Sequence, residues 1–238
     1  MFKTEVDKFS RRIESFNEKF LRDFEQKLDR MLDPLAFKYK SVMISHGFPP
    51  NGDVPLRLTL DIAKIFDYAE VEKEKKFYYL LFKYYDQVRV KYLLKSWSSI
   101  EWLKRRIPLL EEAVFAHNND LFFLSIPIFL SQLEGAIADG TGHVGEMNFS
   151  LVKNKLKSIL INQKPFNYDK EIEEFYIETV LNGFEHNQNI PVFSRHAILH
   201  GGDTEYGSKE NSLKAVILFD YIIKKIEKES RGQTITNQ

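Results

Sequence analysis

The spacing of apolar residues constrains this chain more than any other feature of its sequence, because these residues recur every three or four positions through long stretches. One such stripe crosses residues 5–31 and consists of Phe9, Ile13, Phe16, Phe20, Phe24, Leu28 and Met31. Another crosses residues 71–95 and includes Phe77, Leu80, Leu81, Tyr84, Tyr85, Val88 and Tyr92. This period gathers apolar side chains on one face of an α-helix. No stretch of useful length alternates apolar and polar residues as a half-buried strand does, so the sequence predicts an all-α helical bundle.

Breaks in this pattern divide the chain into helices and connectors. Besides the two stripes, helices are expected over residues 58–68, 98–117, 120–138, 149–162, 168–184 and 208–229. Turns, loops or polar stretches are expected at residues 46–55, 118–120, 140–145 and 186–191. Pro34 should end the first helix, and Pro127 should kink the helix around it or remove one backbone hydrogen bond. Ser208 fits the N-cap of the last helix.

Length and composition are those of an ordinary globular protein. The 238 residues suit one large domain or two modest ones, and 34 Lys and Arg balance 34 Asp and Glu. We expect an N-terminal long-helix region of unknown role over residues 1–95, a helical domain over residues 96–229 and a frayed tail over residues 230–238. The absence of cysteine excludes disulfide scaffolds, thiolate metal sites and cysteine nucleophiles.

The sequence shows no clear targeting or membrane-spanning segment. Residues 1–5 lead directly into charged side chains, which is unlike a secretory signal. The most apolar run, residues 121–130, contains a proline and is shorter than a bilayer span. These features predict a soluble, cytoplasmic protein with no membrane partner.

One short segment, residues 191–202, departs from the helical pattern around it. It places Arg195, His196 and His200 within six residues, between a proline and a pair of glycines. The run Arg195-His196-x-x-x-His200 resembles the signature of the HEPN superfamily (higher eukaryotes and prokaryotes nucleotide-binding domains), which is an Arg, a polar residue and, after three more residues, a His. Residues 124–135 and 195–214 also resemble a group of uncharacterised bacterial proteins with HEPN-like C-terminal halves. The resemblance covers roughly residues 98–229 and implies a HEPN-like helical fold there.

This resemblance implies a metal-independent endoribonuclease, of the toxin or phage-defence type, that needs no cofactor. In such enzymes the ribose 2′-hydroxyl attacks the adjacent phosphate and leaves a 2′,3′-cyclic phosphate. His200 would be the general acid and base, because imidazole transfers protons near neutral pH. Arg195 would clamp the phosphate, because a guanidinium fits two phosphoryl oxygens at once. His196 would orient the site or contact phosphate, and Glu134 and Tyr206 are candidate supporting residues.

The spacing of the motif bears on the oligomeric state. Residues five positions apart on a regular helix point about 140° away from each other. Arg195 and His200 therefore converge only if the segment is irregular, which the glycine pair permits, or if two copies meet across a symmetric dimer. HEPN domains commonly dimerise with their motifs facing each other, so the resemblance implies a homodimer. An antitoxin or other regulatory partner is also expected.

Basic residues concentrate between residues 73 and 106, where the chain has ten basic residues and three acidic ones. Aromatic residues are interleaved with them, and unpaired bases stack on exposed aromatic rings beside a basic track. We therefore expect RNA contacts from Lys91, Lys95, Arg105 and Arg106. A solvated helix face would explain the same pattern.

Plainer readings of the candidate site residues stay open. Glu134 could be the polar edge of its helix, and Tyr206 could cap or pack against the closing helix. The main alternative function is a non-catalytic α-helical module that binds RNA or protein, although such a module has no need of an acid/base histidine at this spacing. A zinc site on His196 and His200 would need a third ligand from His143, Asp203 or Glu205, and no metal is predicted.

Overall fold

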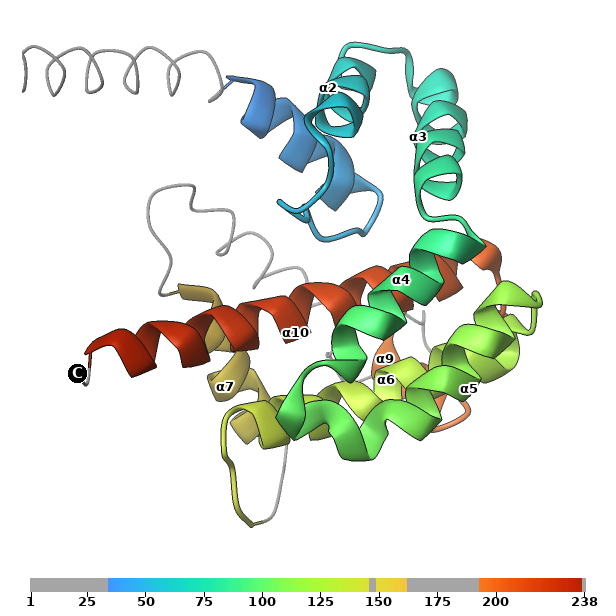
Figure 1. The fold of residues 1–238 in the computed structure, drawn as a ribbon. Coiled ribbons are helices and arrows are strands. Elements are labelled where there is room, and N and C mark those ends of the chain that lie inside the picture. The colour runs from blue at the N-terminus through green and yellow to red at the C-terminus, as the bar shows by residue number, and fades with distance from the viewer. Residues whose placement is uncertain (1–33, 146–148, 162–192, 237–238) are drawn as a thin grey trace, which may run out of the picture.

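The structure is a computed structural model that describes residues 34–145, 149–161 and 193–236. Within these residues every regular element is a helix and no strand is found (Figure 1), which confirms the all-α prediction. The helices predicted over residues 5–31 and 168–184, and the polar stretch over residues 186–191, lie outside the described residues.

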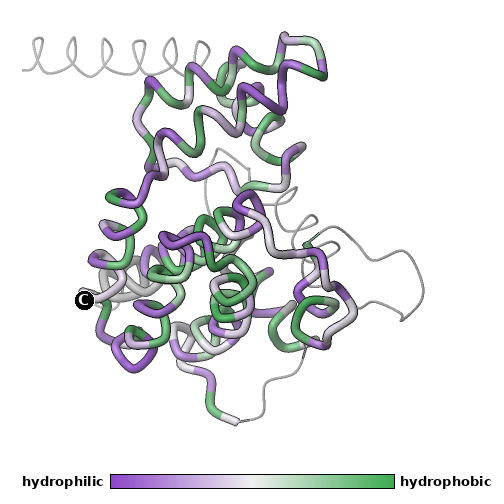
Figure 2. Tube along the Cα trace, turned by 90° about the vertical axis from the view of Figure 1, so that its right-hand side faces the viewer, coloured by the Kyte–Doolittle hydropathy of each residue, from purple (hydrophilic) through white to green (hydrophobic). Residues whose placement is uncertain are grey.

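The helices form two parts that share one apolar core. Residues 34–45 are helical and are followed by α2 (Leu56–Ile65) and α3 (Glu70–Tyr84), and these three lie together at one end of the molecule (Figure 1). The other part contains α4 (Gln87–Ser98), the 3-10 helix η1 (Glu101–Arg106), α5 (Ile107–Asn118), α6 (Phe122–Gly140), α7 (Phe149–Ile161), α9 (Arg195–Leu199) and α10 (Lys209–Thr236). Apolar and polar residues alternate in short blocks along these helices (Figure 2), as they do in amphipathic helices.

The centre of the core lies between α6 and α10, which pack against each other more extensively than any other pair of described helices. Residues 212–223 of α10 are buried without interruption. Trp97 of α4 meets Phe129 of α6 and Phe219 of α10 edge to face, with ring centroids 6.1 and 5.2 Å apart. This geometry is favourable for aromatic pairs, and it fixes α4 onto the two central helices.

α6 is long enough and apolar enough to cross a membrane, judged by its length and composition alone. In the structure it lies within the bundle, in contact with α5, α7, α9, α10 and η1. Its hydropathy therefore matches its place as the central helix of the bundle.

A buried carboxylate joins the two parts of the molecule. Asp220 on α10 is fully buried and accepts hydrogen bonds from Trp97 Nε1 at 3.0 Å and from Asn51 Nδ2 at 3.1 Å. The ammonium of Lys224 pairs with the same carboxylate at 2.8 Å. Asn51 belongs to residues 46–55, which contain neither helix nor strand, as predicted. Because a buried charge needs such partners, this connector is held against α4 and α10.

The single helix predicted over residues 71–95 is wrong, because the chain divides it into α3 and α4. Tyr85 leaves helical geometry, and Asp86 then caps α4 by accepting a hydrogen bond from the backbone N–H of Arg89 at 2.8 Å. Aspartate is a favoured N-cap. The apolar period nevertheless continues across residues 84–88, so the break could not be recognised from the spacing of apolar residues.

The helix predicted over residues 98–117 is also wrong in its first part. Ser98 ends α4, and η1 precedes α5, which has Pro108 in its first turn, where the missing N–H is tolerated. The boundary expected at residue 95 falls inside α4.

The remaining helix bounds agree more closely. Ser208 caps α10 as predicted, since its Oγ accepts a hydrogen bond from the backbone N–H of Asn211 at 3.1 Å. α10 then continues to Thr236, past the predicted end at residue 229. Residues 34–45 and the short helix α9 are elements that the sequence did not predict.

Candidate active site

The Arg195–His200 motif consists of α9, a five-residue helix that is fixed at both ends, and its C-cap residue His200. At its start the Ser194 Oγ accepts a hydrogen bond from the backbone N–H of Ala197 at 3.2 Å. At its end Gly201 adopts a left-handed φ of 73°, and the N–H of Gly202 bonds to the Ala197 carbonyl at 2.7 Å. This is a Schellman C-cap, which needs a residue that tolerates positive φ. The glycine pair therefore ends the helix at the histidine.

Arg195 points to α6, where it meets Glu134. Its Nη2 lies 2.7 Å from Glu134 Oε2, and its side chain is only 14% exposed. The Nε of Arg195 is buried and has no hydrogen-bond partner among the described residues. A mostly buried ion pair of this kind holds the guanidinium in place, so Glu134 positions Arg195.

The two histidines contact each other. The rings of His196 and His200 have centroids 4.4 Å apart and planes inclined by 46°. Burial lowers the pKa of His196 from its ordinary value of 6.5, the positive charges of His200 and Arg195 lower it further, and the Glu134 carboxylate opposes them. The neutral form of His196 is therefore favoured, and His200, at the end of α9, is exposed.

Within one chain the motif forms a cluster of four side chains rather than a direct pair. The contacts among the described residues join Arg195 to Glu134 and His196 to His200. Because the pKa of His196 responds to the charges of all three neighbours, the four groups share one electrostatic environment. The structure thus brings together the two predicted catalytic residues and two of the three predicted supporting residues.

Tyr206, the third predicted supporting residue, lies elsewhere. Its hydroxyl donates a hydrogen bond to the carbonyl of Phe123 at 3.2 Å, and the two rings pack edge to face with centroids 5.2 Å apart. Phe123 is in the first turn of α6, eleven residues from Glu134, which corresponds to about 16 Å along a helix. These contacts give Tyr206 a packing role.

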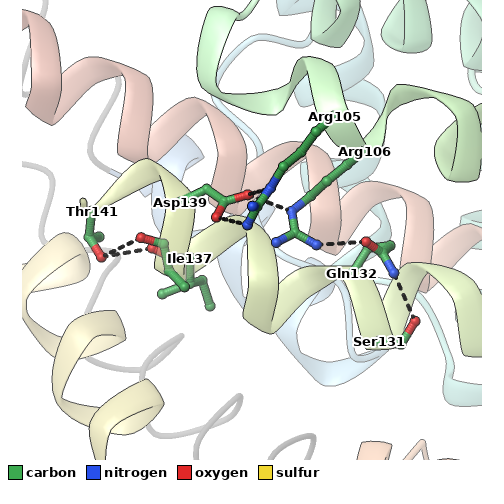
Figure 3. Close-up of polar contacts among 8 residues, drawn as sticks. Arg105, Arg106, Ser131, Gln132, Ile137, Asp139 and Thr141 are labelled. Carbon is green, nitrogen blue, oxygen red and sulfur yellow. Dashed lines mark hydrogen bonds and ion pairs between the residues drawn. The ribbon is translucent and has the colours of Figure 1, made fainter. Parts of the chain in front are cut away.

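Arg105 and Arg106 bind α6 (Figure 3). Arg105 binds both carboxylate oxygens of Asp139, and Arg106 Nε lies 2.9 Å from the same carboxylate. Arg106 Nη1 also donates to Gln132 Oε1 at 2.7 Å. Gly135 leaves room for this guanidinium, because a Cβ there would collide with it. Both arginines, which were expected to contact RNA, are engaged in joining η1 to α6.

Lys91 and Lys95 are exposed on α4, and neither ammonium pairs with a carboxylate among the described residues. They remain free to meet an anionic ligand. The described part of the chain contains no group of three or more His, Asp or Glu side chains placed to hold a metal ion.

Two further clusters were not anticipated from the sequence. His117, Ser212 and Ser125 form a buried hydrogen-bonded chain from α5 through α10 to α6, with distances of 2.7 and 3.0 Å. The Arg89 guanidinium lies over the rings of Tyr84 and Tyr92. A serine inside an apolar helix was the only signal for the first cluster, and the Tyr-x₄-Arg-x₂-Tyr spacing was the signal for the second.

Comparisons with known protein families, with curated proteins and with solved structures found no match to this chain.

Proposed function

We propose that this protein is a metal-independent endoribonuclease of the HEPN type, with Arg195 and His200 as its catalytic residues. The observation that supports this proposal best is the cluster of Glu134, Arg195, His196 and His200, in which Glu134 holds the guanidinium of Arg195 and the two imidazoles contact each other. A guanidinium beside a proton-transferring imidazole is what cleavage of RNA by its own 2′-hydroxyl requires.

The reaction needs three tasks from these side chains. The ribose 2′-oxygen forms a bond to phosphorus while the bond from phosphorus to the 5′-oxygen breaks, which gives a 2′,3′-cyclic phosphate and a free 5′-hydroxyl. Arg195 neutralises the charge that builds on the phosphoryl oxygens. His200 transfers the proton between the oxygens, and neutral His196, against its ring, orients it. Glu134 acts through Arg195 by fixing its guanidinium.

A homodimer would place a second copy of this cluster opposite the first. The exposed position of His200 at the end of α9 supports this arrangement, because a group inside the bundle could not meet a partner or a substrate. A toxin or phage-defence role, with an antitoxin as regulatory partner, belongs to the same proposal.

The test is RNA cleavage by the purified full chain in EDTA, beside Arg195→Ala and His200→Ala. Each substitution should reduce cleavage at least about a hundredfold, the order expected for losing an acid/base group or a charge clamp. Arg57→Ala is the matched control, because this arginine is exposed on α2 and pairs only with Asp61 among the described residues. The products should carry a 2′,3′-cyclic phosphate.

Equal cleavage by the wild type and both variants would contradict the proposal, and so would cleavage that EDTA abolishes. If the chain binds RNA without cutting it under any condition, the alternative of a non-catalytic RNA-binding module is favoured.

A further inference from the structure

The exposed face of α4 is rich in positive charge. The helix contains Arg89, Lys91 and Lys95 and no acidic residue. Asp86, just before it, already accepts a backbone hydrogen bond as the N-cap. Among the described residues no carboxylate pairs with either lysine. This surface therefore suits an anionic ligand.

An ordered stack of side chains stands beside this charge. The guanidinium of Arg89 lies 4.9 Å from the ring centroid of Tyr84 and 5.1 Å from that of Tyr92. Its Nε is buried and has no hydrogen-bond partner among the described residues, so the two rings are its principal contacts. Cation–π contacts of this kind fix a ring in place. Tyr92 is nevertheless 58% exposed, so the stack ends in an aromatic surface open to solvent.

The helix arranges the neighbours of Tyr92 on the same face. Val88, 75% exposed, is four residues before Tyr92, and Lys95 is three residues after it. Side chains at these spacings are adjacent on a helix surface. Lys91 and Lys95 are four residues apart, so they lie close together around the helix and about 6 Å apart along its axis. The two ammonium groups thus lie on the same side of the Tyr92 ring, next to Val88.

We propose that this surface, formed by Val88, Arg89, Lys91, Tyr92 and Lys95, binds single-stranded RNA. One base stacks on the exposed ring of Tyr92, which Arg89 holds in place, and two successive phosphates of the adjoining strand meet Lys91 and Lys95. A single strand is required because the bases of a duplex are already stacked on each other and cannot reach the ring. The choice of RNA rests on the proposed ribonuclease function, but the surface is separate from the cluster on α9. An acidic peptide offers the charge without the flat ring that the stack would extend.

Binding is measured on the full chain carrying Arg195→Ala and His200→Ala, so that cleavage cannot interfere. A fluorescein-labelled single-stranded RNA of twelve uridines is titrated by anisotropy at several salt concentrations. Tyr92→Leu should weaken binding about tenfold, the loss of one stacked base, and Tyr92→Phe should stay within about twofold of the parent. Lys91→Gln with Lys95→Gln should lower the slope of log Kd against log salt by about 1.4, because each phosphate contact on a single strand contributes about 0.7.

Matched controls are Tyr68→Leu and Lys64→Gln with Lys75→Gln, which change exposed residues of the same types away from α4, and these should not alter binding. A single-stranded DNA of the same length should bind comparably, because the contacts do not involve the 2′-hydroxyl. Unchanged binding by Tyr92→Leu, or equal binding of a duplex, would overturn the proposal. If the chain with its catalytic residues intact cleaves RNA while Tyr92→Leu binds normally, only this inference fails and the proposed ribonuclease stands.

Discussion

Pro127 and Tyr206 show how one residue can replace a hydrogen bond that another removes. Pro127 has no N–H, so the carbonyl of Phe123, four residues earlier in α6, loses its partner within the helix. The hydroxyl of Tyr206 donates to that same carbonyl. Tyr206 thus replaces the hydrogen bond that Pro127 removes, although it lies eighty-three positions away from Phe123 in the sequence.

This relation predicts a coupling between the two sites. Tyr206→Phe keeps the ring on Phe123 but removes the donor, and should cost about 1 kcal/mol of unfolding free energy. In a Pro127→Ala background, where the backbone N–H returns, the same substitution should cost much less. Urea unfolding of the four proteins gives the coupling energy. Equal costs in both backgrounds would show that the hydroxyl does not compensate for the proline.

The residues of the candidate site were predictable to different degrees. Arg195, His196 and His200 are close in sequence, so their spacing alone brought them together. Glu134 was visible as a carboxylate in an apolar helix. The partners of Arg106 were not predictable, because Asp139 lies thirty-three positions away and the contact depends on the packing of η1 on α6.

At the level of whole helices, His117 takes part in hydrogen bonds that connect α5, α10 and α6. It is 7% exposed, bonds to Ser212 of α10, and through it reaches Ser125 of α6. Burial lowers the pKa of His117 to about 4, with Lys209 lowering it further and Asp120 opposing. The folded protein therefore keeps this imidazole neutral at pH values where the unfolded chain protonates it.

This difference predicts acid-sensitive packing of α5. Between pH 6.5 and about 4 the unfolded state binds the extra proton, so stability falls as the pH is lowered through that window. The loss should approach about 3 kcal/mol near pH 4, and it should be absent above pH 7. Urea unfolding at pH 7.5, 5.5 and 4.5 measures it. His117→Gln, which has no proton to gain, should flatten the pH dependence, and an unchanged slope would contradict the assignment.

The presence of helices was easier to predict from the sequence than the positions at which one helix ends and the next begins. The apolar period identified α2, α5, α6, α7 and α10 in outline, because each buries one face. It failed between α3 and α4, where the period continues through a break set by the cap at Asp86. It could not find α9, since five residues are too few to show a period and the helix depends on its caps.

At the scale of the whole molecule, Asp220 couples the N-terminal helices to the bundle. Its carboxylate accepts hydrogen bonds from Asn51 and Trp97 and pairs with Lys224. Tyr39 in turn donates a hydrogen bond to the backbone carbonyl of Asn51 at 3.0 Å. A carboxylate within an apolar stretch such as residues 213–223 needs a partner. The sequence could not name the partners of Asp220, which lie up to 169 positions away.

This coupling predicts cooperative unfolding of the described parts. Asp220→Ala leaves the Trp97 N–H and the Asn51 amide buried without an acceptor, and should cost about 3 kcal/mol. In the wild type the loss of tryptophan fluorescence and the loss of helical circular dichroism should coincide, and Asp220→Ala should separate them. Asp53→Ala is the control, because this carboxylate reaches Lys224 from a 65% exposed position and should cost less than about 1 kcal/mol. Coincident transitions in Asp220→Ala would contradict the coupling.

The central position of α6 also has a consequence for the order in which the chain is made. α6 is the most apolar of the described helices, and α10, which covers it most extensively, is synthesised only after residues 141–208. α5 and η1 precede α6 and can cover part of it, but a growing chain on the ribosome leaves the α10 side of this apolar helix uncovered until the last described helix emerges. Chaperones and membrane-insertion machinery would meet that side of α6 during the interval, and any truncation before residue 209 would leave it without its most extensive partner.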